Sequence, residues 1–333
     1  MKRRDFIKMS AGLGAAMATT TPLSPAFAQT KTILKAADVH PLGYPTVEAV
    51  LGMGKKLEAA TNGRLSIQMF PSMQLGGEKE MIEQAQLGAL QIARISVGAV
   101  GPVVDDVNVF NMPFVFRNSK HMEKVIDGEI GDELLNKIST NEKTNLIALC
   151  WMNAGSRNVY NNKKPIKSMA DLKGLKIRMM GNPLFVDTMN ALGGNGVALG
   201  FDQVFSSMQT GVVDGAENNP PSFIAQNHNQ VAKYFTMTEH LIIPELVVYS
   251  RASWQKLSPE DQTLIKKLSK EMQQEQRVLW YAAENAALEK MKAAGTEIIT
   301  DIDKKPFQDA VKPVWDKYGA KYAAMVKRIE AVN

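Results

Sequence analysis

Residues 174–221 read GLKIRMMGNPLFVDTMNALGGNGVALGFDQVFSSMQTGVVDGAENNPP, in which short apolar runs alternate with helix-start and helix-stop signals. The pattern predicts a strand over 175–180, a helix over 183–191, a strand over 197–199, a helix capped by Asp202 and stopped by Gly211, and a strand from 212. Pro220 and Pro221 are expected to act as a stop signal after Asn219. This alternation of strands and helices is typical of an α/β fold.

Two polar residues of this stretch, Arg178 and Asn218, fall at the predicted ends of strands. Ligands of open α/β sheets collect outside the carboxyl ends of the strands, so both residues are candidates for a binding site. The ordinary alternative is a solvated cation at the sheet edge and a simple turn residue. Spacing alone leaves both interpretations open.

Residues 1–28 have the features of an export signal. Arg3 and Arg4 form a twin-arginine pair, a mildly apolar stretch follows, and Ala26-Phe27-Ala28 fits the small-x-small cleavage rule. A membrane anchor would need about 20 strongly apolar residues, but Thr19 to Pro22 interrupt this stretch. We therefore expect export to the periplasm by the twin-arginine route and cleavage after Ala28.

The composition favours a globular protein with no nucleic-acid partner. The whole chain has a formal net charge of +5, of which about +2 remains once the signal is removed. A mature chain of about 305 residues is long enough for two domains with cores of their own. No later segment is long and apolar enough to span a bilayer. Cys150, in an apolar run without a neighbouring His, is interpreted as a buried thiol rather than a nucleophile.

The flanking sequence predicts two lobes. Lobe 1 is expected over 29–152, with strands at 33–37, 65–70, 90–95 and 145–152 and helices at 46–61 and 78–87 and within 119–138. Lobe 2 is expected over 153–240, and 241–257 returns to lobe 1. Ser258-Pro259-Glu260-Asp261 starts a helix to about residue 294 that, at roughly 50 Å, should bridge both lobes. Residues 295–333 should pack on the lobes.

Glu78 and Arg94 lie at element ends in the first predicted lobe. Glu78 has an ordinary alternative as a first-turn carboxylate that the helix dipole favours, and Arg94 as an edge charge. However, Arg94 stands inside the apolar run LQIARI, and a fully buried strand does not normally carry an unpaired charge.

No catalytic, cofactor or metal motif appears. The chain contains no nucleophile elbow, P-loop, dinucleotide fingerprint or close His/Cys pair, and His40, His121, His228 and His240 are dispersed. We therefore predict no catalytic residues, no metal and no cofactor. An exported α/β protein of two lobes with Arg and amide groups at strand ends has the profile of a binding protein rather than an enzyme.

Several motifs in fixed order resemble the extracytoplasmic solute-binding proteins of tripartite ATP-independent periplasmic (TRAP) transporters. They are Leu75-Gly76-Gly77-Glu78, Gly174 to Met179, Leu192-Gly193, Met208 to Asn218 and Leu257 to Gln262. The resemblance extends over nearly all of 30–330. It implies a monomer with a periplasmic binding protein fold of two α/β lobes, two crossing strands and a long bridging helix. It also implies a cleft that closes over an organic anion for delivery to membrane subunits.

The same resemblance implies the ligand contacts. In the family, the arginine of the GLKIR block pairs with a ligand carboxylate, and it corresponds to Arg178. The other correspondences are Arg157, Asn218, Glu78 and Phe201. His40, Arg94 and Asn218-Asn219 resemble the subset that binds sugar acids such as glucuronate and galacturonate. A C4-dicarboxylate remains an alternative ligand, although it would need fewer hydrogen-bonding groups.

Two rival classes stay open at this point. A binding protein of an ATP-driven transporter would share the two-lobed shape but not the ordered motifs. A periplasmic enzyme acting on sugar acids would reveal itself by product formation.

Export and cleavage give the first testable prediction. Because Ala26 and Ala28 supply the small residues that the cleavage rule requires, the mature protein should begin at Gln29. Mass spectrometry of periplasmic material measures this directly. A mature fraction that retained Met1 would contradict it.

Overall fold

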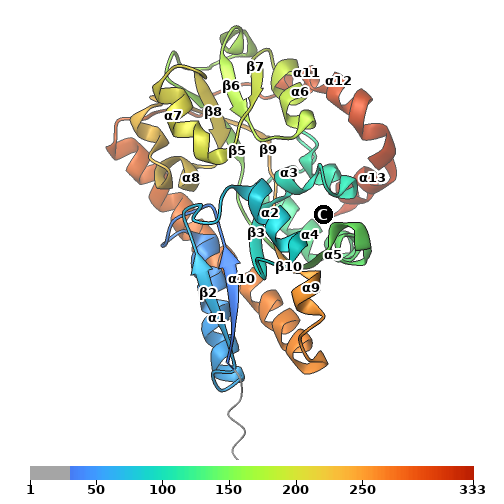
Figure 1. Cartoon of the computed structure of the whole chain (residues 1–333). Coiled ribbons are helices and arrows are strands. Elements are labelled where there is room, and N and C mark those ends of the chain that lie inside the picture. The colour runs from blue at the N-terminus through green and yellow to red at the C-terminus, as the bar shows by residue number, and fades with distance from the viewer. Residues whose placement is uncertain (1–30) are drawn as a thin grey trace, which may run out of the picture. The chain divides into compact units, whose positions relative to one another are not determined.

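Two β-sheets carry the fold of this computed structural model, which describes residues 31–333. The export signal predicted for residues 1–28 lies outside the described residues. The strands are β1 (Thr32–Ala37), β2 (Leu65–Phe70), β3 (Ile92–Ser96), β4 (Leu146–Met152), β5 (Arg157–Asn161), β6 (Lys176–Met179), β7 (Asn195–Ala198), β8 (Gly215–Asn218), β9 (Tyr234–Leu241), β10 (Glu245–Ser250) and β11 (Glu297–Ile299). Figure 1 shows one sheet in the upper and the other in the lower half of the molecule.

The first sheet has the strand order β2-β1-β3-β10-β4. Strands β1 to β3 are parallel, and β10 runs antiparallel to both β3 and β4. Its helices are α1 (Pro45–Ala60), α2 (Glu78–Leu87), α3 (Val97–Val100), α4 (Ser119–Asp127), α5 (Glu129–Thr140) and α9 (Arg251–Trp254). The helical segment expected within 119–138 is thus two helices, because the extended backbone of Gly128 ends α4 and starts α5.

The second sheet has the order β11-β9-β5-β8-β6-β7. Strands β6, β7 and β8 are parallel, and β5 runs antiparallel to β8 and β9. Its helices are α6 (Pro183–Ala191), α7 (Val204–Gln209) and α8 (Pro220–Ala225). The third strand of the opening stretch begins at Gly215 rather than at 212, where the side chain of Val212 is exposed. Both sheets are therefore mixed, and the predicted α/β class is confirmed.

Two local expectations in lobe 2 are wrong. Pro220 and Pro221 do not stop the chain but open α8, since a proline at the first helical position loses no hydrogen bond. The side chain of Asn219 caps that helix by accepting from Ser222 N at 2.8 Å. Asp202 lies within the 3₁₀ turn Phe201–Gln203 that precedes α7, and Gly200 takes the cap position.

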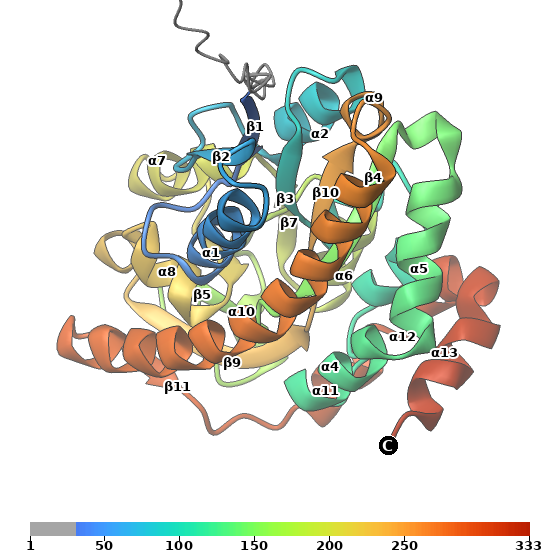
Figure 2. The same ribbon diagram turned by 90° about the horizontal axis from the view of Figure 1, so that it is seen from below.

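The chain crosses between the sheets twice, from β4 to β5 and from β9 to β10. The long helix α10 (Pro259–Ala293) has 35 residues and is therefore about 50 Å long. It packs on α1 and β4 of the first sheet and on α8 and β11 of the second, and Figure 2 shows it running beneath both. The predicted two-lobed fold with a bridging helix is confirmed.

Helix α10 also fixes the first crossing segment. Gln276 Oε1 accepts from Asn153 N at 2.9 Å, and Gln276 Nε2 donates to Asn153 O at 2.8 Å. Two residues later, Gly155 has a φ of +61°, and a Cβ atom there would lie 3.1 Å from the Trp280 ring. The crossing segment thus lies tightly against the bridging helix and needs glycine at residue 155.

The C-terminal segment packs on elements of both sheets. It contains α11 (Lys305–Ala310), α12 (Lys312–Val314) and α13 (Ala323–Ala331); α12 contacts α6, and α13 contacts α5. Within residues 31–333, none of the helices combines the length and apolar character that a membrane crossing would require.

The contact between α10 and the crossing segment gives a stability prediction. Gln276→Ala leaves the buried N–H and C=O groups of Asn153 without partners, so the free energy of unfolding should fall by about 1–3 kcal/mol. Urea unfolding followed by circular dichroism measures this. Gln274, on the exposed side of the same helix, provides the control: Gln274→Ala should change stability by less than about 0.5 kcal/mol. Equal losses for both variants would contradict the assignment.

Candidate functional site

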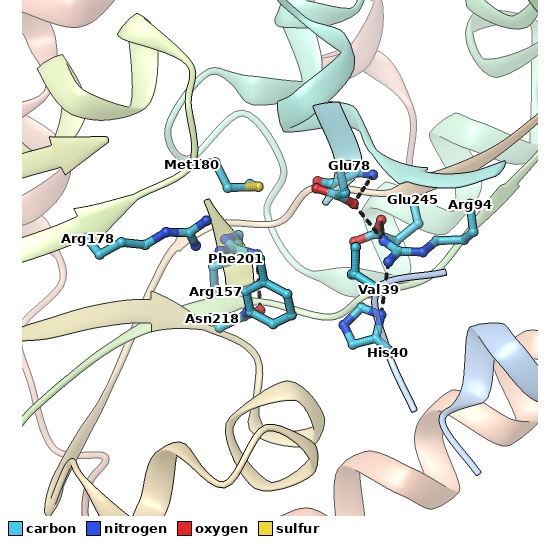
Figure 3. A pocket seen from close by; sticks show the side chains of 11 residues that line it. Val39, His40, Glu78, Arg94, Arg157, Arg178, Met180, Phe201, Asn218 and Glu245 are labelled. Atoms are coloured by element: carbon cyan, nitrogen blue, oxygen red, sulfur yellow. Dashed lines mark hydrogen bonds and ion pairs between the residues drawn. The ribbon is translucent and has the colours of Figure 1, made fainter. Parts of the chain in front are cut away.

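A pocket lies between the two sheets. Its empty volume is about 310 Å³, including the space at its open mouth. On the first-sheet side, its lining comes from the segment after β1 and from α2, β3 and β10. On the second-sheet side, it comes from β5, β6, β8 and the turn before α7 (Figure 3). The lining residues are Val39, His40, Glu78, Arg94, Ser96, Arg157, Arg178, Met180, Phe201, Asn218 and Glu245. An outer hollow shares Glu78, Arg178, Met180 and Phe201 with this pocket and connects it to solvent.

Seven of the eight predicted site residues line the pocket, although their roles in binding are not thereby tested. They are His40, Glu78, Arg94, Arg157, Arg178, Phe201 and Asn218. The eighth, Asn219, lies just outside, where it caps α8 and accepts from Tyr44 Oη at 3.5 Å. The site prediction missed Val39, Ser96, Met180 and Glu245.

Arg178 is a buried cation without an acidic partner. It extends from β6 with 2% of its surface exposed, and its Nε donates to the carbonyl oxygen of Leu199 at 2.8 Å. Within residues 31–333, its terminal Nη atoms make no hydrogen bond or ion pair, and burial lowers the pKa of the guanidinium. Figure 3 shows the guanidinium pointing into the pocket. Its Cζ atom lies 5.8 Å from the centroid of the Phe201 ring. Arg178 can therefore take an anion that enters the pocket.

Arg157, by contrast, is already neutralised. Its Nη2 donates to Glu217 Oε1 at 2.7 Å, and its Nη1 donates to Asn218 Oδ1 at 3.1 Å. Burial acts against the charged form, but the Glu217 carboxylate raises the pKa of Arg157 above its ordinary value. Among the described residues, Nη1 makes only this one hydrogen bond, and Arg157 lines the pocket.

Arg94, from β3, lies on the opposite side of the pocket and holds three carboxylates. Its Nη2 donates to Asp38 Oδ1 at 2.6 Å, and its Nη1 donates to Glu78 Oε1 at 3.0 Å and to Glu245 Oε2. Arg94 is 1% exposed, so these contacts satisfy a charge that the sequence analysis identified as unusual in a buried strand.

Two carboxylate oxygens of this cluster remain available. In the part of the chain that the structure describes, no hydrogen bond reaches Glu78 Oε2 or Glu245 Oε1, while Glu78 Oε1 also accepts from Ser96 N at 2.8 Å. Burial raises the pKa of Glu245 to about 7. The pocket therefore presents free donors at Arg178 and free acceptors opposite them.

Asp38 and His40 support the cluster from the end of β1. Asp38 Oδ1 accepts from His40 N at 2.9 Å, and Asp38 Oδ2 accepts from Thr46 Oγ1 at 2.5 Å. Although burial favours its neutral form, Arg94 and His40 hold the pKa of Asp38 below its ordinary value. Burial and then Arg94 lower the pKa of His40, so its ring is neutral at pH 7.

The two lobes touch directly on both sides of the pocket. Tyr44 stacks on His40 at a centroid distance of 3.7 Å, and its Oη lies 2.8 Å from Ser222 Oγ of α8. On the other side, Asn182 Nδ2 donates to Gly98 O at 3.2 Å and to Asn108 Oδ1 at 3.0 Å. These contacts join the first sheet's elements to the second's and define a closed arrangement.

A feature of the sequence indicates that Glu245 is an ion-pair partner of a buried cation. Glu245 is an isolated acid in the apolar run LIIPELVVYS, as Arg94 is an isolated cation in LQIARI. Val247 pairs with Arg94 across β10 and β3, so Glu245, two residues earlier, points to the same face. Opposite isolated charges in two apolar strands are therefore a usable signal for an ion pair.

The acids of the pocket surround a guanidinium rather than a metal position. Among residues 31–333, no group of three or more His, Cys, Asp or Glu side chains has the geometry to hold a metal ion. The arrangement can bind an anion at Arg178 and hydrogen-bond donors at the opposite carboxylates.

Comparison with known proteins places this geometry in a family. Residues 36–321 match the model of the bacterial extracellular solute-binding proteins, family 7 (DctP). A TRAP periplasmic solute-binding protein from Pseudomonas putida F1, solved with D-glucuronate, is 59% identical; the match covers 91% of this chain and 98% of that one, with a TM-score of 0.89. A Bradyrhizobium protein, solved with galacturonate, is 42% identical over 90% and 99% of the two chains, with a TM-score of 0.86.

A relative from Citrobacter koseri is known in two states. Its complex with D-glucuronate is 48% identical over 91% of this chain and all of that one, with a TM-score of 0.89. Its apo, open structure matches with a TM-score of only 0.79, at 46% identity over 90% of this chain and 98% of that one. The better match to the liganded form agrees with the direct contacts between the lobes.

The family model covers most of the chain, and the solved structures match its fold with TM-scores of up to 0.89. The chain therefore belongs to the DctP family of extracytoplasmic solute-binding proteins of TRAP transporters.

Proposed function

We propose that this protein captures a hexuronate, D-glucuronate or D-galacturonate, in the cleft between its lobes and delivers it to TRAP membrane subunits. The observation that carries the proposal is Arg178, a buried guanidinium whose terminal amino groups have no partner among the described residues. A charge in this setting is costly unless an anion pairs with it. The ligand carboxylate supplies that anion through two parallel hydrogen bonds.

The opposite side of the pocket supports a hydroxylated ligand. Among the described residues, no hydrogen bond reaches one oxygen each of Glu78 and Glu245, and a carboxyl group in its ionised form accepts but does not donate. Sugar hydroxyls are donors that match them. His40 and Asn218 line the same pocket and add further polar contacts.

The relatives that were solved with D-glucuronate and with galacturonate support this ligand class. Membership in a periplasmic family supports the predicted location, and the twin-arginine pair supports the export route. We further infer that the protein binds its ligand without turning it over, so that the sugar acid should be recovered unchanged from the complex.

Arg178 provides the direct test. Arg178→Ala leaves the ligand carboxylate desolvated and unpaired, which should cost about 2–5 kcal/mol of binding free energy. The dissociation constant should therefore rise by about 30-fold to several thousand-fold. Arg178→Lys keeps the charge but loses the fork, so it should bind more weakly than wild type and more tightly than the Ala variant. Isothermal titration calorimetry with both uronates gives the affinities.

The matched control is Arg328→Ala, which removes a partly exposed arginine that pairs with Glu133 on the surface. Its uronate affinity should equal that of wild type. If a folded Arg178→Ala protein bound within about threefold of wild type, or under 1 kcal/mol, Arg178 would not be the anchor.

Closure of the cleft on ligand binding gives another prediction. Arg157, Arg178 and Asn218 belong to the second sheet, whereas His40 and Glu78 belong to the first, so one ligand contacts both and favours the closed state. Small-angle X-ray scattering should show a smaller radius of gyration with saturating uronate. Arg178→Ala at the same uronate concentration should stay open. An unchanged wild-type radius at saturation would remove the hinge argument.

A further inference from the structure

Asp38, Glu78 and Glu245 meet at the single guanidinium of Arg94. Figure 3 shows Glu78 and Glu245 beside this guanidinium. Arg94 carries one positive charge against these three carboxyl groups, and burial and Arg94 keep His40 neutral. The first-sheet side of the pocket is therefore negative, whereas Arg178 makes the second-sheet side positive. Because these groups are buried, salt and water screen their charges much less than at the surface.

The cluster contains more carboxyl groups than Arg94 needs as partners. Asp38 is saturated by Arg94, His40 and Thr46 and is fully buried, so it acts as the structural partner. Glu78 and Glu245 each accept a hydrogen bond from the same Nη1 of Arg94 through one oxygen, and both residues line the pocket. Two carboxylates thus face the ligand where one would already have neutralised Arg94.

This surplus has a consequence for ligands with two carboxylates. A uronate places its one carboxylate at Arg178 and its hydroxyls at Glu78 and Glu245. A ligand of similar length with a carboxylate at each end brings the second one against these two acids, and like charges in contact at a binding site are strongly unfavourable.

We propose that Glu245, together with Glu78, is a specificity-determining residue that rejects ligands carrying a second carboxylate and so restricts the cleft to monocarboxylate sugar acids. This inference rests on the proposed function, because it takes Arg178 as the position of the first carboxylate. Glu245 was not among the predicted site residues, and it lines the pocket from the start of β10, the strand that returns from lobe 2.

Glu245 can lose its charge without loss of the cluster. In Glu245→Gln, Arg94 keeps Asp38 and Glu78 as partners. Since glutamine has the size of glutamate, the substitution changes charge and not shape.

The experiment compares D-glucuronate with D-glucarate, which keeps the hydroxyls and has a carboxylate at both ends, and with succinate. Calorimetry on wild type, Glu245→Gln, Glu78→Gln and the double variant gives each affinity. Wild type should bind glucuronate and reject both dicarboxylates. Each single variant should raise the ratio of glucarate to glucuronate affinity by at least about tenfold, and the double variant by more.

The matched control is Glu289→Gln, which removes one negative charge from the exposed face of α10, where Glu289 pairs with Lys292 at 2.7 Å. Its selectivity should equal that of wild type. Circular dichroism of each variant reports that it is folded. Rejection of both dicarboxylates that persisted in the double variant would show that shape sets the selectivity, and would overturn the inference.

The two failures can be distinguished. A wild-type protein that does not bind uronates, or that binds succinate more tightly, would overturn the proposed function and the inference with it. A wild type that binds glucuronate through Arg178, while the Gln variants leave selectivity unchanged, would overturn the inference alone.

Discussion

Three arginines are buried at one cleft, and the described chain supplies acidic partners for only two of them. Arg94 is held by three carboxylates and Arg157 by Glu217, whereas Arg178 has a carbonyl oxygen for its Nε. A buried charge without a counter-ion is unstable in a medium of low dielectric constant. The unequal distribution of acids therefore favours an anion at Arg178, and in the proposed function it sets the direction in which a ligand with one charged end lies.

Because the charged groups lie on two lobes, ligand binding in the proposed function is coupled to closure of the cleft. The donors and the acceptors belong to different sheets, which the chain joins by two crossings and the bridging helix α10. A ligand that spans the pocket lowers the free energy of the closed state relative to the open one, because only the closed state provides both sets of contacts. The contacts of Tyr44 with Ser222 and of Asn182 with Gly98 add to the closed state at the two sides of the same cleft.

Local sequence patterns determined much of the secondary structure and several site residues. Helix α2 occupies the predicted range 78–87, and the Ser-Pro-Glu-Asp start marks α10 because capping depends on neighbours within one turn. Arg94 was conspicuous because a charge in an apolar strand needs a partner. The prediction of a stop signal at Pro220 was wrong, because proline both ends strands and begins helices. Only the cap at Asn219 distinguishes the two cases.

The partners of the charges were decided by tertiary structure alone. Arg94 and Glu245 are 151 residues apart, and Arg157 and Glu217 are 60 apart, so no local pattern joins them. The sequence indicated that Arg178 belongs to the site, but not that Arg157 is neutralised while Arg178 is not. That difference depends on which strands lie side by side and which faces they share, because ion pairing acts over a few ångströms in space and not along the chain.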